Sequence, residues 1–305
     1  MKLQPVAVIV GPTGVGKTTL AIRLAQELGA EIVSADSLQV YREMNIGTAK
    51  PTPEQQAQVR HHLIDVVNPD QDFDAAEYCR RGREIIAGLH SRGIAPLVVG
   101  GTGLYIKALL HGLVKEGRQD QVIRRGLRQE LAAAGLPPLY ARLQRLDPQT
   151  AARIHPHDAF RILRALEVIT LTGQPLSRWQ AAHGFQDRPY RVLKIGLNLP
   201  RPELYGRINS RVEEMLGQGL LSEVEALLNC YDPGLKPFQA LGYRHLIAYL
   251  RGKLSWETTI DQLQRDTRRY AKRQLTWFKA DSEIRWLEPD YWPPARELLR
   301  EFFRR

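Results

Sequence analysis

A glycine-rich loop near the N-terminus constrains the fold of this chain more than any other feature. A β-branched run at residues 6–10 leads directly into GPTGVGKT, and apolar residues then recur at helical spacing over residues 19–28. This order of strand, loop and helix is that of the GxxxxGK[ST] phosphate-binding loop. We therefore predict an α/β fold whose core resembles that of P-loop NTPases, with a parallel sheet.

The residue types of this loop suit the binding of phosphate. Glycines allow the backbone N–H groups to turn toward phosphate oxygens, and the N-terminus of the following helix adds a positive dipole. Lys17 would neutralise phosphate charge, and Thr18 could hold Mg²⁺, which is the cofactor we expect. The predicted phosphate-binding residues are Gly11, Pro12, Thr13, Gly14, Val15, Gly16, Lys17 and Thr18.

Two further strand patterns end in polar residues. Residues 31–35 lead into Asp36, and residues 96–99 lead into a second glycine-rich segment that contains Thr102. Ligands of open α/β sheets bind beyond the carboxyl ends of the strands. We therefore expect Lys17, Asp36 and Thr102 to meet in one crevice.

The pattern changes at about residue 116. Helical spacing recurs over residues 122–134, 139–146, 148–153 and 159–172, and strand character returns over residues 190–199. We predict a core domain of residues 1–115 and 191–305, with residues 116–190 as an inserted all-helical domain. Further helices are expected at about 201–217, 220–229, 238–251 and 255–280, and these complete the predicted regular structure.

The charge of the chain favours a polyanionic partner. The net charge is +10, and most of it lies in residues 116–190, which carry +4, and residues 240–280, which carry +6. No uncharged stretch exceeds 14 residues, so we expect no membrane-spanning segment. The two cysteines form no CxxC pair, which fits a reducing compartment, and we expect a cytoplasmic protein.

The predicted helix at 255–280 has a basic face. Arg265, Arg268, Lys272 and Lys279 share that face, with Tyr270, Trp277 and Phe278 among them. Basic groups with interleaved aromatic rings are typical of contacts to looped or single-stranded RNA, although a solvated helix with a buried aromatic face has the same spacing. From the residues alone, three functions stay open: an RNA-modifying enzyme, an ATP-dependent small-molecule kinase and a non-catalytic RNA-binding protein. A GTPase is excluded because the NKxD and DxxG motifs do not occur.

Six motifs together resemble the tRNA dimethylallyltransferases. They are GPTGVGKT, DSLQVYREMNIGTAKP at residues 36–51, LVVGGTGLY from Leu97, RIHP from Arg153, RALEV from Arg164 and AKRQLTWF from Ala271. They follow the family's order along nearly the whole chain. The resemblance implies transfer of an isopentenyl group to N6 of adenosine 37, beside the anticodon. It also implies that the phosphate-binding loop holds the diphosphate of dimethylallyl diphosphate without ATP, and that the anticodon stem-loop of tRNA lies between the core and the insertion.

The resemblance also assigns roles to residues. Asp36 would be the base that takes the N6 proton, Thr102 a second contact to the reacting groups, and Lys17 and Arg211 the cations that stabilise the departing diphosphate. The implied tRNA contacts are Asp36, Ser37, Leu38, Gln39, Thr102, Arg124, Phe160, Arg161, Arg164, Gln239, Gly242, Tyr243, Arg244, Lys272, Arg273, Gln274, Trp277 and Lys279. We expect a monomer that binds tRNA and dimethylallyl diphosphate. The chain departs from the family's pattern at His157 and His245, and before Arg124 it lacks the prolines expected there.

Overall fold

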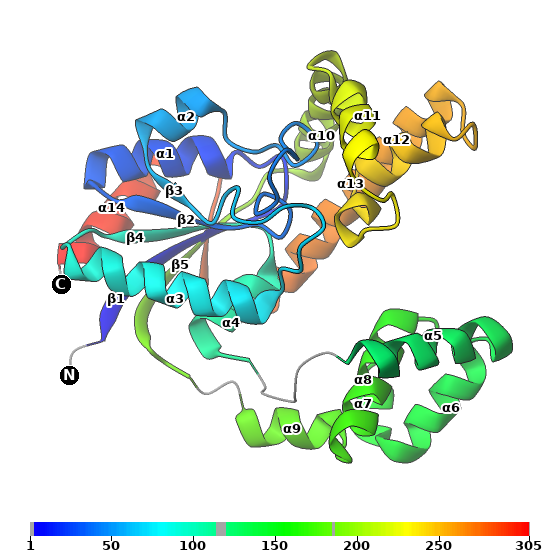
Figure 1. Cartoon of the computed structure of the whole chain (residues 1–305). Helices are drawn as coiled ribbons and strands as arrows, with labels where there is room; N and C mark the ends of the chain where they lie inside the picture. Colours follow the sequence, from blue (N-terminus) through cyan, green and yellow to red (C-terminus); the bar gives the residue numbers. More distant parts are fainter. Residues whose placement is uncertain (1–2, 114–119, 185–186, 305) are drawn as a thin grey trace. The chain divides into compact units, whose positions relative to one another are not determined.

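The computed structural model describes residues 3–113, 120–184 and 187–304 and divides into two compact units (Figure 1). The first unit comprises Met1–Leu110 and Arg188–Arg305, and the second is His111–Asp187. The boundary predicted between residues 115 and 116 lies outside the described residues. The second segment of the first unit starts at Arg188, and the strand predicted over residues 190–199 follows it as β5 (Tyr190–Leu197).

A six-stranded sheet forms the centre of the first unit, in the order β3-β2-β4-β1-β5-β6. All its neighbouring strands are parallel, so the predicted fold class is confirmed. The remaining strands are β1 (Gln4–Val10), β2 (Glu31–Ala35), β3 (His61–His62), β4 (Pro96–Gly100) and β6 (Ile284–Leu287). Because β1 lies between β4 and β5, the glycine-rich loop that follows β1 emerges at the middle of the carboxyl edge.

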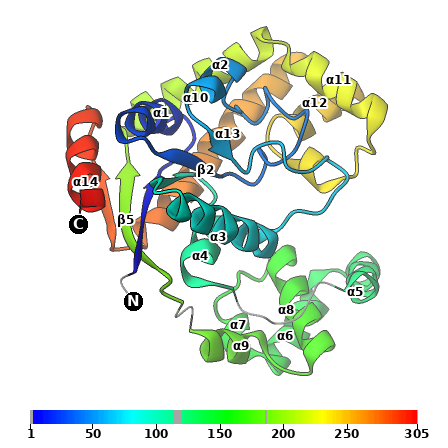
Figure 2. The ribbon, with the colours of Figure 1, turned by 60° about the vertical axis from the view of Figure 1, so that its left-hand side comes forward.

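Helices cover both faces of this sheet (Figure 2). Val6, Val8 and Val10 of β1 pack into one hydrophobic cluster, while Ala7 and Ile9 pack into another on the opposite face, as the period-two geometry of a strand requires. The helices of this unit are α1 (Lys17–Leu28), α2 (Pro53–Gln58), α3 (Ala75–Ser91), α4 (Gly103–His111, which ends in the second unit), α10 (Arg201–Gly217), α11 (Leu220–Cys230), the 3-10 helix η1 (Lys236–Gln239), α12 (Tyr243–Leu250), α13 (Trp256–Lys279) and α14 (Trp292–Arg304).

Two predictions about the C-terminal region are wrong. The single helix expected at 238–251 is interrupted, because Gly242 adopts a φ of 86° between η1 and α12. Regular structure also continues beyond residue 280 as β6 and α14. The strand β6 is only four residues long, and it exists because it pairs with β5.

The regular structure of the second unit, over its described residues, is entirely helical. It contains α5 (Gln121–Ala134), α6 (Leu136–Leu146), α7 (Pro148–Ala151), α8 (Ala159–Thr172) and α9 (Leu176–His183). Leu127, Leu143 and Ile162 belong to a hydrophobic cluster formed by residues of this unit alone. A unit with its own core is what a helical insertion requires.

Candidate active site

The loop between β1 and α1 has the geometry of a phosphate cradle. Gly14 and Gly16 adopt φ values of 82° and 97°, which L-residues with side chains rarely reach. α1 begins at Lys17, whose Nζ donates to the carbonyl oxygens of Gly11 at 3.0 Å and Pro12 at 2.8 Å. The N-terminus of a 12-residue helix and a lysine thus lie at one end of the loop, an arrangement that binds anions.

Positive charge is concentrated beside this loop. Burial and the charge of Arg211 lower the pKa of Lys17 to about 7, although the negative charge of Asp36 acts to raise it. Burial also lowers the pKa of Arg211, against the attraction of Asp36 and Glu214. Two cations held close together away from water favour an anionic ligand, because the ligand would relieve their repulsion.

Thr13 of the loop forms hydrogen bonds with two C-terminal helices. Its backbone N–H donates to Oε1 of Gln274 on α13 at 2.8 Å, and its Oγ1 accepts a 3.5 Å hydrogen bond from Arg211 on α10. The side chain of Gln274 also donates to the carbonyl oxygen of Gly101 at 3.0 Å. A Cβ at Gly101 would lie 2.2 Å from Nε2 of Gln274, so this link requires glycine there. Gln274 therefore connects the loops that follow β1 and β4.

Asp36 lies at the carboxyl end of β2 with one oxygen already engaged. Its Oδ1 accepts the backbone N–H of Leu38 at 2.8 Å and that of Gln39 at 3.3 Å. These bonds fix the carboxylate and leave Oδ2 to accept from a ligand. Thr102 follows the neighbouring β4, and its Oγ1 accepts the backbone N–H of Ser37 at 3.1 Å.

Most of these groups line one cavity of about 1290 Å³ in the first unit. Lys17, Thr18, Asp36 and Arg211 line it, as the sequence predicts for Lys17 and Asp36. Thr102 does not line it, although the sequence predicts that it does; its Oγ1 accepts from the backbone N–H of Ser37, which is a lining residue. The volume exceeds the roughly 300–1000 Å³ typical of a small-molecule pocket. The cavity therefore has room for a phosphorylated molecule and for part of a second ligand.

Several predicted RNA contacts of the first unit are exposed. Gln239, Arg244, Lys272, Arg273 and Lys279 are on the surface, and the side chain of Trp277 is 46% exposed. The ring of Trp277 packs against the start of α4, because a Cβ at Gly103 would lie 2.0 Å from its Nε1. This ring therefore has one face on the protein and another part in solvent.

Other predicted contacts are engaged inside the protein. Tyr243 is fully buried, and Gln274 is 7% exposed with its amide bonded as described above. The amide of Gln39 is half-buried: its Nε2 donates to the carbonyl oxygens of Thr48 and Ala49, and its Oε1 accepts from Ser34. Each of these three side chains uses its polar atoms to hold the protein's own backbone or side chains, and a direct RNA contact by any of them stays a prediction.

The predicted basic face of α13 is also narrower than its spacing implies. Arg268 is half-buried and donates to Oδ1 of Asn209 on α10 at 2.6 Å. Arg265 and Arg269 lie 3.8 and 3.4 Å from Oδ1 of Asp266. Helical spacing could not reveal the packing of α13 on α10.

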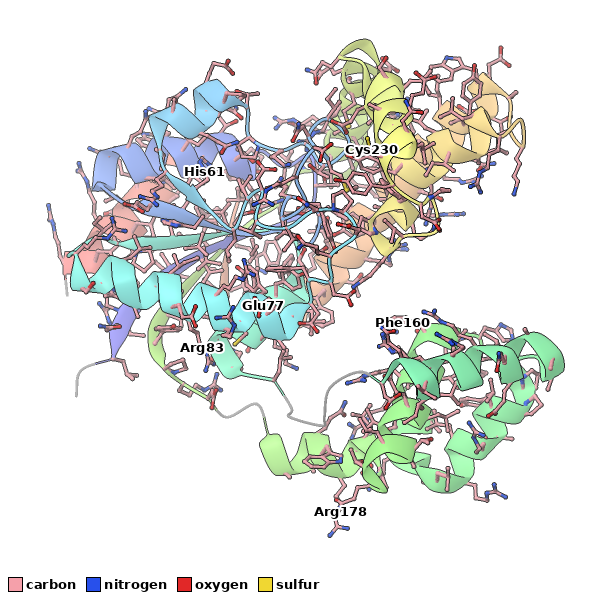
Figure 3. The ribbon with its side chains drawn as sticks, in the orientation of Figure 1. His61, Glu77, Arg83, Phe160, Arg178 and Cys230 are labelled. Carbon is pink, nitrogen blue, oxygen red and sulfur yellow. The ribbon has the colours of Figure 1, made fainter. Side chains whose placement is uncertain are left out.

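In the second unit the predicted contacts fall into two groups. Arg124 and Arg164 both pair with Glu167, a side chain only 2% exposed, at 2.9 and 3.1 Å. Phe160 at the start of α8 is 76% exposed, and its neighbour Arg161 is exposed and pairs with Asp158 (Figure 3). Arg124 and Arg164 thus help to hold the unit together, and Phe160 offers an uncovered ring.

Sequence reasoning missed the role of Tyr270. Its side chain lines the cavity, and burial together with the negative charge of Asp36 raises its pKa. Leu263, Thr267, Tyr270 and Gln274 form a stripe at helical spacing along α13, and all four line the cavity. The helical spacing of that stripe is the sequence signal that indicates a cavity-lining face. It lies beside the basic residues of α13, which indicate a surface role instead.

In the described part of the chain, no three His, Cys, Asp or Glu side chains form a group that could hold a metal ion. Mg²⁺ commonly uses only one or two protein ligands together with phosphate oxygens, so a hydroxyl such as that of Thr18 suits it. Over residues 3–113, 120–184 and 187–304, no helix is both long and apolar enough to cross a membrane.

Comparisons with known proteins agree on one family. The family model described as "IPP transferase" matches residues 39–281, and that of the ATPase family associated with various cellular activities matches residues 7–67. The chain is 56% identical over 286 residues to a tRNA dimethylallyltransferase of Syntrophobacter fumaroxidans, covering 93% of this chain and 83% of the relative. It is also 56% identical over 294 residues to tRNA dimethylallyltransferase 2 of Syntrophus aciditrophicus, covering 96% and 94%.

Solved structures give the same result. The tRNA isopentenylpyrophosphate transferase of Bacillus halodurans is 38% identical, with a TM-score of 0.74 over 99% of this chain and 97% of that one. A eukaryotic dimethylallyltransferase acting on tRNA is 28% identical, with a TM-score of 0.80 over 97% of this chain and 78% of that one.

Proposed function

The chain belongs to the IPP transferase family, and we propose that it transfers a dimethylallyl group from dimethylallyl diphosphate to N6 of adenosine 37 in tRNA. The observation that carries this proposal is the single cavity lined by two cations, Lys17 and Arg211, and by the carboxylate of Asp36. The cations suit a diphosphate leaving group, and the carboxylate suits an amine that must lose a proton.

The diphosphate would occupy the loop after β1. The backbone N–H groups of residues 11–16, the N-terminus of α1, Lys17 and Arg211 would then share its negative charge. Thr18, which lines the cavity, would hold Mg²⁺, and Mg²⁺ would neutralise further charge on the diphosphate when bound. These contacts strengthen as the leaving oxygen gains charge, so they stabilise the transition state more than the bound substrate.

Asp36 would receive the proton of the attacking amine. The N6 nitrogen forms a bond to C1 of the dimethylallyl group while the bond from C1 to the diphosphate oxygen breaks. The N6 proton passes to Oδ2 of Asp36, the oxygen opposite the one fixed by Leu38 and Gln39. Diphosphate leaves with the bonding electron pair, so atoms and charge balance without an oxidant or ATP.

The tRNA would be held by surfaces on both units. Gln239, Arg244, Lys272, Arg273, Trp277 and Lys279 of the first unit are exposed for this role, and so are Phe160 and Arg161 of the second. Exposed rings next to arginine and lysine suit a loop whose bases are unstacked. A tRNA substrate favours the cytoplasm, and so do two cysteines that form no disulfide in the described part of the chain; we also propose a monomer.

The decisive experiment is nucleoside mass spectrometry. Anticodon stem-loop RNA with adenosine at position 37 is incubated with the protein, Mg²⁺ and dimethylallyl diphosphate, then digested. We expect N6-isopentenyladenosine, with none when position 37 is guanosine. Consumption of ATP without prenylation would instead support a kinase, and RNA binding with no turnover of either compound would support a non-catalytic RNA-binding protein.

A further inference from the structure

Residues 45–50 form a wall of the cavity in an unusual backbone conformation. All six residues line the cavity. The flanking Glu43 and the included Ala49 have φ values of 65° and 50°, which are costly for residues other than glycine. A segment of this kind keeps its shape only when surrounding contacts hold it there.

Glu223 supplies the largest set of those contacts. Its Oε2 accepts the backbone N–H groups of Asn45 at 2.9 Å and Ile46 at 2.7 Å, and its Oε1 accepts that of Gly47 at 3.1 Å. Glu223 lies in the first turn of α11, more than 170 residues away in sequence. Three consecutive backbone donors thus converge on one carboxylate, as they otherwise do on a bound anion.

Tyr243 completes the shell of Glu223. Its hydroxyl donates to Oε1 at 2.7 Å, and burial together with the charge of Glu223 raises its pKa, so it remains a donor. Its ring lies against Gly47, where an added Cβ would approach ring atoms to 2.6–2.8 Å. The wall is therefore pressed against the ring and bonded to the carboxylate at the same place.

The last residue of the wall, Lys50, holds the C-terminal end of the segment. Its side chain is 4% exposed, and Nζ donates to the carbonyl oxygen of Tyr41 at 2.8 Å and to Oδ1 of Asn45 and Asp65 at 2.7 and 2.5 Å. Two charges of opposite sign, from Glu223 and Lys50, thus fix the two ends of a six-residue segment.

The wall in turn fixes the neighbourhood of Asp36. The carbonyl oxygens of Thr48 and Ala49 accept from Nε2 of Gln39 at 3.3 and 3.2 Å, and the backbone N–H of Gln39 donates to Oδ1 of Asp36. A continuous set of hydrogen bonds therefore runs from Glu223 through the wall to the carboxylate at the end of β2.

Glu223 does not itself line the cavity. We propose that Glu223, with Tyr243, is a positioning residue that shapes the side of the cavity receiving the acceptor adenosine. Two observations assign the wall to the acceptor side of the cavity. The wall packs on Tyr243, which belongs to the 239–244 segment, a lining segment that contains proposed RNA contacts. The phosphate loop, by contrast, is held by Arg211 and Gln274. This inference rests on the proposed function and deepens it.

The kinetic test compares Glu223→Gln with Glu225→Gln. The first change replaces an acceptor oxygen by an NH₂ group that faces backbone donors, while Glu225 is exposed on the same helix and provides the matched loss of charge. For Glu223→Gln we expect KM for stem-loop RNA to rise at least about tenfold, with Kd for dimethylallyl diphosphate within about threefold of wild type. Glu225→Gln should leave both unchanged.

A second readout does not depend on catalysis. Hydrogen exchange at the amides of residues 45–47 should accelerate at least about tenfold in Glu223→Gln, because glutamine offers these three N–H groups one acceptor oxygen instead of two and turns an NH₂ group toward them. If wild-type protein fails to prenylate RNA, the proposed function fails while this exchange result still reports on the wall.

Three results would overturn the inference. They are unchanged exchange at residues 45–47, faster exchange with an unchanged KM for RNA, and an equal loss of donor and acceptor affinity. Should Glu223→Gln fail to fold, Tyr243→Phe keeps the ring against Gly47 and removes one hydrogen bond to Glu223. It should raise KM for RNA about two- to fivefold, and an unchanged KM would count equally against the inference.

Discussion

At the scale of single residues, the orientation of Asp36 decides what its carboxylate can do. Two backbone N–H groups hold Oδ1 of this cavity-lining residue, so its side chain cannot rotate freely. A base that is already oriented loses little entropy when the amine arrives. The same two bonds would be kept by an asparagine, which makes this position suitable for a substitution that changes chemistry alone.

Asp36→Asn should lower kcat by a factor on the order of 10² or more, because the amide cannot accept the N6 proton. Binding of tRNA and of dimethylallyl diphosphate should stay within about threefold of wild type. Single-turnover prenylation and separate binding titrations check the two statements. A variant with wild-type kcat would remove Asp36 from the role of base.

Lys17 gives a pH dependence with a definite sign. Its pKa of about 7 lies below the ordinary lysine value because of burial and Arg211, and a bound diphosphate would favour the charged form. Above about pH 7, binding must therefore take up a proton, so affinity for inorganic diphosphate should fall as pH rises, by up to about tenfold per pH unit.

The matched variant for this titration is Lys17→Met. We expect the Lys17→Met protein to bind diphosphate more weakly, because it lacks one cation. It should also lack the part of the pH dependence that comes from Lys17. Protonation of the diphosphate itself affects both proteins equally and cancels in the comparison. Parallel pH profiles of Kd for the two proteins would show that Lys17 does not change its protonation state on binding.

At the scale of elements, α13 serves two surfaces at once. Its buried side carries Gln274 to the phosphate loop, and its exposed side carries Lys272 and Lys279. A 24-residue helix is long enough to do both, because successive turns repeat the same two faces. The helix thus connects an exposed basic surface with the loop that follows β1.

Lys272→Ala combined with Lys279→Ala should weaken tRNA binding and reduce the slope of log K against log salt by about 1.5, since each lysine would contact one phosphate. Replacing Arg251 and Lys253 by alanine removes two other exposed cations and serves as the control. Binding is measured across a salt series. An unchanged slope would mean that these lysines are solvated and do not contact RNA.

At the scale of the whole molecule, the two units have separate cores and separate charged clusters. Glu167 is buried in the second unit and accepts from the backbone N–H of Asp120 at 3.2 Å besides pairing with Arg124 and Arg164. Every residue that lines the cavity belongs to the first unit. A substitution in the Glu167 cluster should therefore lower the stability of the second unit and leave the cavity of the first unit unchanged.

Glu167→Gln should destabilise the helical unit by about 2 kcal/mol, less than the ~3–5 kcal/mol for a fully buried pair because both arginines reach solvent. Hydrogen exchange should accelerate in α5 and α8, while Kd for inorganic diphosphate stays within about twofold of wild type. Loss of diphosphate affinity equal to the loss of stability would contradict this separation.

The sequence alone determined the α/β class, the phosphate loop and the polar residues at the ends of β2 and β4, because these depend on short-range patterns and on the fixed geometry of a parallel sheet. It also carried the family, through motifs along nearly the whole chain. Tertiary structure alone decided what lies behind those motifs. Gln39, Tyr243 and Gln274 turn out to hold the protein's own backbone or side chains, and β6 exists only through its pairing with β5.

The physical reason is the range of the interactions. Helical and strand periods report which face of an element is apolar, but they do not report which distant element packs on it. Glu223 reads as an ordinary surface glutamate of an amphipathic helix until residues 45–47 are brought to it from the other end of the chain. Local sequence thus predicted which residue types lie at the site. The contacts that position those residues came only from the fold.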